Sequence, residues 1–269
     1  MKDVITEIVA HKRAELAVTM QKRVSMAACL RQSPSGIIAE FKRKSPSKGW
    51  IHPDVEPEDV IPLYARGGAA AVSILTNEEY FGGKPEYITR ARTALRGVAD
   101  GITTPRLPIL RKEFIVDPYQ VYEAKMLDAD ALLLIAADLT AEAYGELLTL
   151  AHRLGLEVLL EVHDPAELDY LKAGVPDMLG VNNRSLGTFH TDVQHSFDIA
   201  ARMTAAVSAL RLPPDATPVL VSESGISKPE TVRQLRDAGF RGFLIGECFM
   251  REDEPGQALE AFTTALQQL

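Results

Sequence analysis

Cysteine is almost absent from this sequence, which has only Cys29 and Cys248 among 269 residues. Two cysteines are too few for a disulfide framework, so we expect both to be buried free thiols. The first residues have mixed charge and lack the apolar stretch of a secretion signal, and no apolar run approaches the roughly 20 residues that a membrane helix needs. These absences predict a cytoplasmic protein.

An excess of positive charge is also lacking. Lys and Arg together number 29 and Asp and Glu 37, which gives a formal net charge of −8. No broad basic field exists to attract a phosphate polymer or an anionic lipid surface, so we expect neither nucleic acid nor membrane as a partner. The basic residues that do cluster, as in FKRK at positions 41–44, therefore predict a small anionic ligand.

The motifs of several cofactor, metal and nucleophile enzymes are missing. No G-x-G-x-x-G follows the first expected strand, as a dinucleotide site would require. The histidines are scattered without H-E-x-x-H spacing, and no paired cysteines occur, so no metal site is predicted. No serine lies in a G-x-S-x-G elbow. We therefore expect neither a cofactor nor a metal.

One pattern recurs along the chain: a polar helix, a Gly or other small residue, a short apolar run and an abrupt polar cluster. The apolar runs show no alternation, as expected of strands covered on both faces. They predict eight strands, at Ile37–Phe41, Ala71–Leu75, Pro108–Leu110, Ala131–Ile135, Glu157–Leu160, Met178–Val181, Val219–Val221 and Gly242–Ile245.

Eight strands that alternate with eight helical segments favour an α/β (β/α)8 TIM barrel over an open doubly wound sheet. The last helical segment is expected at about Gly256–Gln267. Since no linker divides the chain, we expect residues 1–269 to form one domain. Residues 1–35 precede the first strand with an imperfect helical pattern, which predicts an N-terminal helical extension that caps one end of the barrel.

Charged side chains gather where the expected strands end, the face that carries the active site in such barrels. Glu40 and Lys42 end the first strand, Lys112 the third and Glu161 the fifth. Side chains two apart on a strand share a face, so we expect all four in the barrel mouth. Together they offer a proton donor and a proton acceptor, with pKa values drawn toward neutrality by partial burial. The alternative is a set of salt bridges that only closes the rim.

Glycines mark the ends of the last two strands, in SESGIS (222–227) and IGE (245–247). Their backbone N–H groups can face an anion, and in many barrels these two loops bind phosphate. We therefore predict a phosphate site there. Two residues stay open: His163 either reaches the site or is structural, and Trp50 is either a wall against an aromatic substrate or a loop anchor.

Several stretches near the strand ends carry a family resemblance: AEFKRKSPSKG (39–49), ILTNEEYFGG (74–83), LRKEFIVDPYQVYEA (110–124), LLEVHD (159–164), GVNNRSL (180–186), SESGI (222–226) and LIGECFMR (244–251). In this order they resemble the signature stretches of the indole-3-glycerol phosphate synthase family. The resemblance covers nearly all of the chain from about residue 35 onward. The ordered set is far more specific than any one motif.

The resemblance implies a carboxy-lyase (a decarboxylase) of tryptophan biosynthesis, and thus of aromatic amino acid biosynthesis. Its substrate, 1-(2-carboxyphenylamino)-1-deoxyribulose 5-phosphate, closes a pyrrole ring with loss of carbon dioxide and water to give indole-3-glycerol phosphate. The substrate carries a carboxylate and a phosphate, about three negative charges. A fixed ammonium group stabilises the charge that develops at the carbonyl oxygen during ring closure. We interpret the basic cluster as the cationic mouth of an acidic body.

Residue roles follow from the resemblance, position by position. It implies that Lys112 is the general acid at the ribulose carbonyl and that Glu161 is the base of the later dehydration. Lys42 would hold the substrate carboxylate and is a second candidate for an acid, and Glu40 would orient the lysines. The further expected contacts are Asn182 and Glu223 at the anthranilate moiety and, at the substrate and phosphate end, Ser45, Arg184, Ser224, Gly225, Gly246 and Glu247.

Two departures from the family pattern and two rival functions remain. Glu247 stands where a hydroxyl residue would bind an anion, so we expect its side chain to point away and only its N–H to contribute. Trp50 is bulky for a mobile first loop. One rival is phosphoribosylanthranilate isomerase, whose Amadori rearrangement needs no lysine like Lys42 for a carboxylate. The other is a barrel that binds a phosphorylated ligand without turnover, which predicts a broken catalytic set. We expect a monomer or a weak homodimer.

Overall fold

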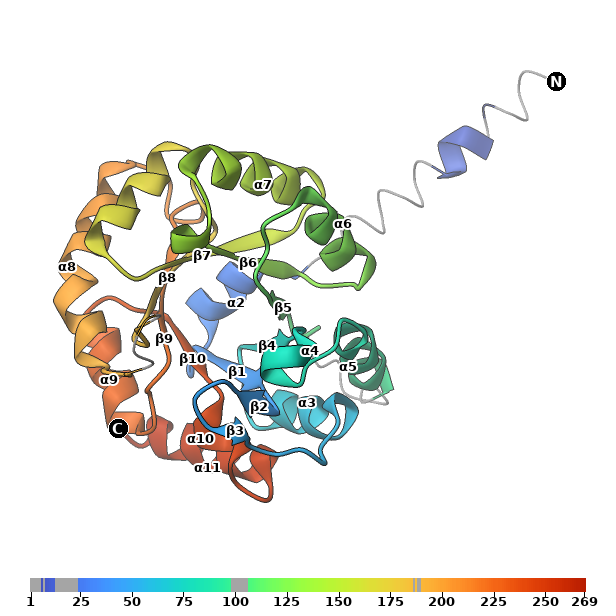
Figure 1. Cartoon of the computed structure of the whole chain (residues 1–269), viewed down its shortest axis with the longest axis vertical. Helices are drawn as coiled ribbons and strands as arrows, with labels where there is room; N and C mark the ends of the chain where they lie inside the picture. Colours follow the sequence, from blue (N-terminus) through green and yellow to red (C-terminus); the bar gives the residue numbers. More distant parts are fainter. Residues whose placement is uncertain (1–5, 7, 13–23, 98–105, 186, 188–189) are drawn as a thin grey trace.

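The computed structural model of the chain describes residues 6, 8–12, 24–97, 106–185, 187 and 190–269. Eight strands form one closed barrel with every neighbouring pair parallel, in the order β1-β10-β9-β8-β7-β6-β5-β4 (Figure 1). These strands are β1 (Ile37–Phe41), β4 (Ala71–Leu75), β5 (Ile109–Lys112), β6 (Ala131–Ile135), β7 (Glu157–Val162), β8 (Met178–Asn182), β9 (Val219–Glu223) and β10 (Gly242–Ile245). The predicted TIM barrel is confirmed.

Helices form the outer layer around the strands (Figure 1). They are α3 (Pro57–Arg66), α4 (Glu78–Phe81), α5 (Glu86–Gly97), α6 (Pro118–Met126), η1 (Ala136–Asp138), α7 (Ala141–Arg153), η2 (Pro165–Lys172), α8 (Gln194–Ala209), α9 (Pro229–Asp237), α10 (Glu247–Met250) and α11 (Pro255–Gln267). A helical segment follows each of the eight strands, as predicted, although η2 is a 3-10 helix. The first loop also contains a small antiparallel hairpin, β2 (Lys44–Ser45) with β3 (Gly49–Trp50), which the sequence pattern did not predict.

Several strands extend beyond the apolar runs that predicted them. Lys112 pairs with Leu75, Glu161 with Ile135, and Asn182 with Glu223 in the barrel ladders. The predicted strands ended too early, because polar residues at the barrel mouth still pair with residues of the neighbouring strands. These four polar residues (Lys112, Glu161, Asn182 and Glu223) therefore stand on rigid backbone rather than on loops.

The core has two parts that follow the alternation of side chains along each strand. Ile38 and its equivalents fill the inside of the barrel, while Ile37, Ala39 and Phe41 pack outward against the helices. Glu40 lies two residues after Ile38 and points into the barrel mouth, where it lines a cavity. The predicted parity of the first strand is confirmed.

A helix ahead of the barrel closes its amino end. Helix α2 (Met26–Gln32) packs Met26 and Leu30 against the inward-facing residues at the start of the strands, and Figure 1 shows it through the ring of strands. The carboxylate of Glu157, the first residue of β7, accepts hydrogen bonds from the Ser25 hydroxyl and from the N–H of Ala27, the latter at 3.0 Å. The predicted cap is thus present as α2. Residues 1–5, 7 and 13–23 of the predicted extension lie outside the described residues.

Cys29 and Cys248 are both free, as predicted, but each is only partly buried. Among the described residues, none of the helices combines the length and apolar character that a membrane crossing needs.

The packing of α2 gives a prediction about stability. Because Met26 is fully buried inside the closed end, Met26→Ala should lower the free energy of unfolding by about 2–4 kcal/mol. Any activity at the barrel mouth should change by less than about twofold in the folded protein, since the substitution lies at the opposite end of the barrel. Urea denaturation measures the first quantity. The exposed Gln32→Ala on the same helix is the control, and equal stability of both variants would contradict the packing.

Candidate active site

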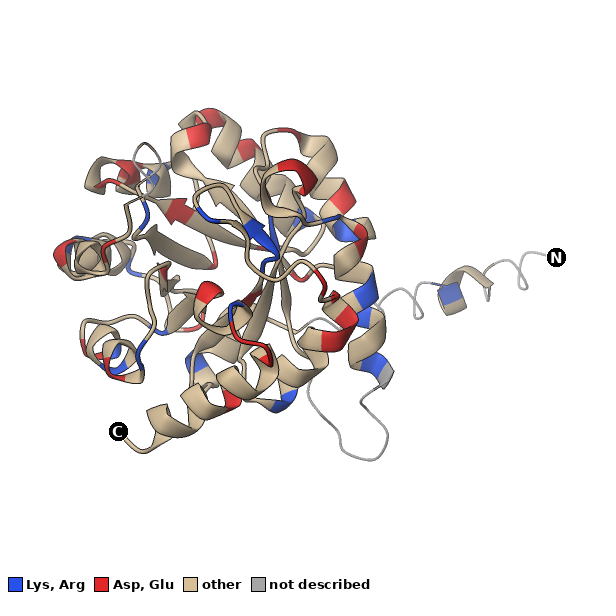
Figure 2. Ribbon diagram, turned by 60° about the horizontal axis from the view of Figure 1, so that its bottom comes forward, with Lys and Arg blue, Asp and Glu red and all other residues tan. Residues whose placement is uncertain are grey.

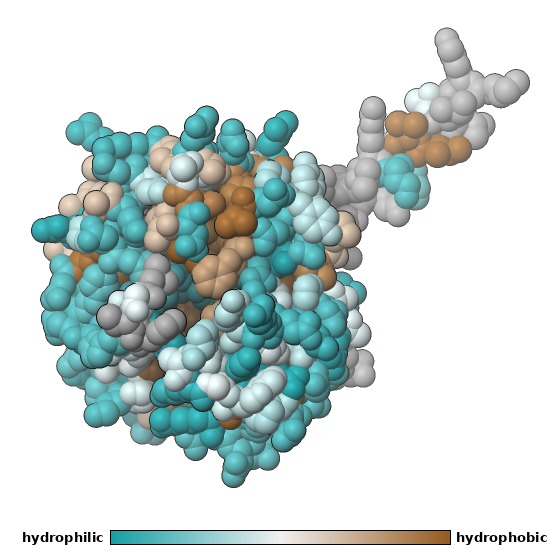
Figure 3. Space-filling model, in the orientation of Figure 1, coloured by the Kyte–Doolittle hydropathy of each residue, from teal (hydrophilic) through white to brown (hydrophobic). Residues whose placement is uncertain are grey.

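Two adjoining cavities open at the carboxyl ends of the strands. The first has a volume of about 620 Å³ and the second of about 490 Å³. Both are lined by Glu40, Lys42, Arg184, Ser224 and Leu244, so one ligand can reach from one cavity into the other. Figure 3 shows hydrophobic atoms gathered in and beside the hollow of this face.

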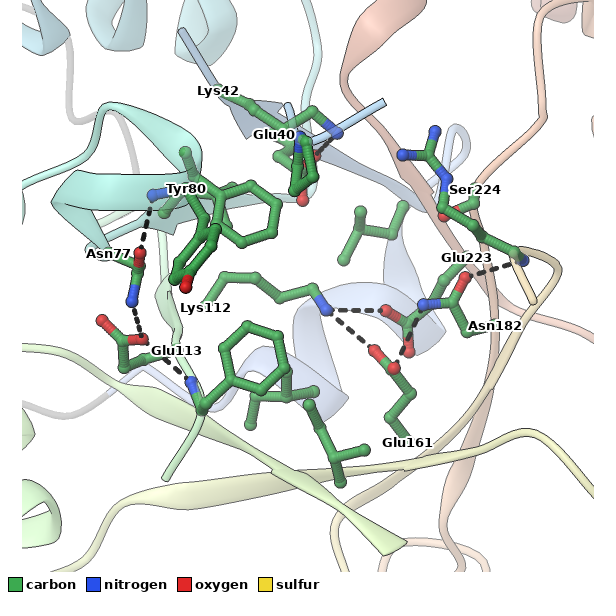
Figure 4. A pocket seen from close by; sticks show the side chains of 18 of the residues that line it. Glu40, Lys42, Asn77, Tyr80, Lys112, Glu113, Glu161, Asn182, Glu223 and Ser224 are labelled. Atoms are coloured by element: carbon green, nitrogen blue, oxygen red, sulfur yellow. Dashed lines mark hydrogen bonds and ion pairs between the residues drawn. The ribbon is translucent and has the colours of Figure 1, made fainter. Parts of the chain in front are cut away.

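A lysine and two glutamates meet inside the first cavity (Figure 4). Lys112 Nζ lies 2.8 Å from Glu161 Oε2 and 3.5 Å from Glu223 Oε2. Asn182 Nδ2 donates to Glu161 Oε1 at 3.1 Å, and Asn182 Oδ1 accepts from the Arg184 N–H. The structure thus brings together four residues from four different strands, β5, β7, β8 and β9.

The charge states of Lys112 and Glu161 differ from the prediction. Burial lowers the pKa of Lys112, but Glu161 and Glu223 outweigh it and raise that pKa above its usual value. Burial raises the pKa of Glu161, but Lys112, His163 and Asn182 together lower it to about 2. The predicted shift toward neutrality is wrong for this pair, because a direct ion pair stabilises both charges more than burial penalises them.

Glu223 shows the opposite behaviour. Burial and the neighbouring Glu161 carboxylate raise its pKa well above the usual value, although Lys112 opposes them. Two carboxylates share one ammonium group, and the more distant one binds a proton more readily. Gly180 on β8 provides the space, since any Cβ there would collide with Glu223 Oε1. Glu223 therefore keeps its proton to a higher pH than an ordinary glutamate does.

A second ion pair stands where the two cavities join. Lys42 Nζ lies 2.7 Å from Glu40 Oε1, and both side chains are largely buried. A Cβ on Gly246 would lie 2.7 Å from Glu40 Oε1, so glycine is needed for this close approach. Lys42 and Glu40 are therefore close to the phosphate-site glycines as well as to the first cavity.

Apolar walls complete the first cavity. They are formed by Leu75, Tyr80, Phe81, Phe114, Leu133, Ile135 and Leu244. The rings of Phe81 and Phe114 lie 6.3 Å apart. None of these was a predicted site residue, although Phe114 follows Lys112 by two positions and Tyr80 and Phe81 lie in a stretch that carried the resemblance. The flat rings of the three aromatic residues suit an aromatic ligand.

The second cavity is lined by turns. Ser224 and Gly225 both adopt positive φ, at 69° and 78°, just after β9 ends. A non-glycine residue with positive φ is strained and is typical of functional sites. With Gly246 at the start of α10, these residues line the cavity together with Arg184 and Lys48. Four of the predicted phosphate-site residues, Arg184, Ser224, Gly225 and Gly246, are thus brought to one place.

Two predicted phosphate-end residues lie differently from expectation. The Glu247 side chain does not point away: its carboxylate lines the second cavity, forms an ion pair with Lys48 and lies 3.8 Å from Arg184 Nη2. The carboxylate instead meets nearby cations, Lys48 above all, which lower its pKa. Ser45 is buried in β2 and lines neither cavity.

His163 and Trp50 can now be placed. His163 Nε2 lies 3.3 Å from Glu161 Oε1, but the imidazole lines neither cavity, so it neighbours the site from behind Glu161. Trp50 is 56% exposed, and its ring packs on Gly82, where a Cβ would lie 2.8 Å away. Lys44 Nζ lies over the same ring. Trp50 is thus a loop anchor rather than a cavity wall.

The distribution of charge corrects the expectation of a cationic mouth. Acidic and basic residues are interspersed over the molecule (Figure 2). The first cavity has no positive excess: its cations are Lys42, Lys112 and Arg184 and its carboxyl groups are Glu40, Glu113, Glu161 and Glu223. The second cavity has two more cations than carboxylates: its cations are Lys42, Lys48, Arg184 and Arg251 and its carboxylates are Glu40 and Glu247. Within the described ranges, no cluster of three or more His, Cys, Asp or Glu side chains could hold a metal ion.

Comparisons with known proteins identify the family of the chain. The family model for indole-3-glycerol phosphate synthase matches residues 2–262. The chain is 49% identical to the indole-3-glycerol phosphate synthase of Bacteroides thetaiotaomicron, over 99% of this chain and 100% of that protein. It is 41% identical to the one of Carboxydothermus hydrogenoformans, over 93% and 88% of the two chains.

Solved structures give the fold alone. A thiamine phosphate pyrophosphorylase from Pyrococcus furiosus superposes with a TM-score of 0.59 at 16% identity, over 88% of this chain and 97% of that one. A mutant tryptophan synthase alpha-subunit from the same organism gives 0.58 at 15% identity, over 88% and 99%.

The raised pKa of Glu223 predicts how stability depends on pH. The unfolded carboxyl loses its proton near pH 4.5 and the folded one only at higher pH, so above pH 4.5 the unfolded state is favoured as pH rises. Glu223→Gln removes this effect. Its free energy of unfolding should match that of the parent protein near pH 4 and exceed it increasingly above, by about 1.4 kcal/mol per pH unit until the folded pKa is passed.

Chemical denaturation from pH 4 to 9 measures this difference. Glu146→Gln, an exposed position on α7, is the matched control and should show no such trend. If the stability of Glu223→Gln relative to the parent protein stayed constant or fell as pH rises, the pKa of Glu223 would not be raised in the folded protein.

Proposed function

This chain belongs to the indole-3-glycerol phosphate synthase family, and we propose that Lys112, Glu161 and Lys42 divide the acid–base work of that reaction. The enzyme is a carboxy-lyase of tryptophan biosynthesis and binds a phosphorylated substrate. The observation that carries the proposal is the ion-paired Lys112 at the centre of an apolar cavity that continues into a glycine-lined, cationic one.

The shape and charge of the two cavities support one orientation of the substrate. The anthranilate ring lies in the first cavity between the apolar walls, and the ribulose phosphate reaches into the second. Lys42 stands where the cavities join and holds the substrate carboxylate, with Glu40 fixing its position. The raised pKa of Glu223 favours its uncharged form, which does not repel the anionic substrate as an ionised carboxylate would.

Ring closure is the first chemical step. The aryl carbon attacks the ribulose carbonyl carbon, and Lys112 protonates the oxygen on which charge develops. The carboxylate carbon then leaves as carbon dioxide, and its bonding electrons restore the aromatic ring. The apolar walls favour this loss, because a carboxylate is less well solvated there than in water.

Dehydration completes the product. Glu161, whose pKa of about 2 keeps it ionised, removes a proton from the ring system, and the hydroxyl group leaves as water with a proton from a lysine. Asn182 fixes the rotamer of Glu161 through the hydrogen bond at Oε1. Before Lys112 acts as an acid it must exchange Glu161 for the substrate oxygen, because the ion pair holds its proton tightly.

The two rival functions have less support. The isomerase reaction leaves the Glu40–Lys42 pair without a role, and a binding-only barrel leaves the intact set of Lys112, Glu161 and Asn182 unexplained. One-domain organisation over residues 1–269, a cytoplasmic location, a monomer or weak homodimer, and the absence of nucleic-acid and membrane partners stay predictions. So does activity without a cofactor or a metal.

Lys112→Ala tests the acid. Its kcat should fall about 10²–10⁴-fold while the substrate dissociation constant changes little, since the loss falls on the transition state. The assay follows indole fluorescence after mixing the enzyme with the carboxyphenylamino-deoxyribulose phosphate, without added metal or nucleotide. Lys172→Ala, at an exposed lysine on η2, is the control. Near-normal turnover by Lys112→Ala would remove Lys112 from this role.

Glu161→Gln tests the base. The amide keeps the shape of the side chain but cannot accept the proton, so product formation should nearly cease. Glu113→Gln changes a glutamate of the same cavity that instead accepts hydrogen bonds from Thr76 and Asn77, and it should cost less than about tenfold. If Glu161→Gln kept a third of the parent turnover, the base would lie elsewhere.

A further inference from the structure

The Glu247 carboxylate lies in the cavity that we assign to the substrate phosphate. It lines the second cavity beside Ser224, Gly225 and Gly246. Its side chain is 28% exposed. An anionic side chain inside an anion site repels the ligand, so the position of Glu247 calls for an explanation.

The cations nearest Glu247 are also the ones available to a phosphate. Lys48 forms an ion pair and a hydrogen bond with Glu247 Oε1, and Arg184 Nη2 lies 3.8 Å from Glu247 Oε2. Burial alone would raise the pKa of Glu247, but Lys48, Lys42 and Arg184 hold it below its usual value. The carboxylate is therefore ionised at neutral pH and lies beside the cations that a phosphate would use.

Glu247 is not needed to position Arg184. The Arg184 N–H donates to Asn182 Oδ1 at 3.0 Å, and its Nε donates to Thr191 Oγ1 at 3.3 Å. Its Nη1 lies 3.5 Å from Ser47 Oγ. The separation of 3.8 Å from Glu247 is too long for a hydrogen bond. Attraction to Glu247 therefore adds little to a residue that is already held at its backbone N–H and at two side-chain nitrogens.

Lys48 is bound more loosely. Its side chain is 59% exposed and extends from the first loop, between β2 and β3. An exposed ion pair of this kind is worth little, and its partners exchange readily. A phosphate seated on the N–H groups of Gly225 and Gly246 would bring two charges to the same Lys48 and Arg184.

We propose that the Glu247 carboxylate competes with the substrate phosphate for the same cations. The phosphate displaces the carboxylate on binding, and the carboxylate returns when the product leaves. This rests on the proposed function, since it takes the second cavity as the phosphate site. Between turnovers the carboxylate stays paired with Lys48, beside Arg184. It makes phosphate binding weaker than the cavity alone would give, and it speeds the departure of the phosphorylated product.

Glu247→Gln is the direct test, because the amide has the same shape and no charge. Inorganic phosphate, measured as a competitive inhibitor, should bind about fivefold to twentyfold more tightly to the variant. The KM for the substrate should also be lower. Product dissociation, followed by stopped-flow indole fluorescence, should become slower by a similar factor. Asp253→Asn makes the same change in net charge at an exposed residue outside the second cavity lining and should alter none of these.

A double variant keeps the test sharp. In the Lys48→Ala background, Glu247→Gln should have a smaller effect on phosphate binding, since the shared cation is gone. Weaker phosphate binding by Glu247→Gln would show that the carboxylate holds the site together and would overturn the proposal, as would an unchanged affinity. If phosphate failed to compete with substrate even in the parent protein, the phosphate assignment itself would fall. Thermal unfolding of each variant confirms that folded proteins are compared.

Discussion

The buried ion pair between Lys112 and Glu161 is the interaction on which the site depends. An ammonium group in an apolar cavity is costly unless a carboxylate meets it at hydrogen-bond distance, and here the separation is 2.8 Å. Both residues belong to barrel strands, so ladder hydrogen bonds fix the backbone that carries them. The charge that catalysis needs is thus maintained by the scaffold and does not depend on a loop.

A lysine is paired with a glutamate at three places in the site, and the three pairs differ in burial. Lys112 is paired with Glu161, Lys42 with Glu40, and Lys48 with Glu247. In the first two pairs the side chains are at most 14% exposed, whereas Lys48 is 59% exposed. Exchange of a partner is therefore cheapest at the phosphate end and most costly at the reacting centre. A substrate that first anchors its phosphate can use that binding to separate the buried pairs.

The sequence predicted the barrel and most of the site, because both follow from local patterns. Uninterrupted apolar runs located all eight strands, and alternation placed Glu40 and Lys42 on one face. The features that the sequence did not predict depend on contacts between strands and loops. The direction of the Lys112 pKa shift depends on a spacing across the barrel, and the orientation of Glu247 depends on where Lys48 of a distant loop lies. The β2–β3 hairpin has too few residues to show a period.

The raised pKa of Glu223 follows from its burial and from the charge inside the first cavity. With all side chains ionised, its four carboxylates would exceed its three cations, and an anionic substrate would meet repulsion. The raised pKa of Glu223 acts against this repulsion, because a proton on that carboxyl removes one of the four negative charges. The pKa is raised because the buried carboxyl lies beside Glu161 at the same lysine, and Gly180 leaves the room for that approach. A single missing side chain on β8 thus permits the contact that shifts this pKa.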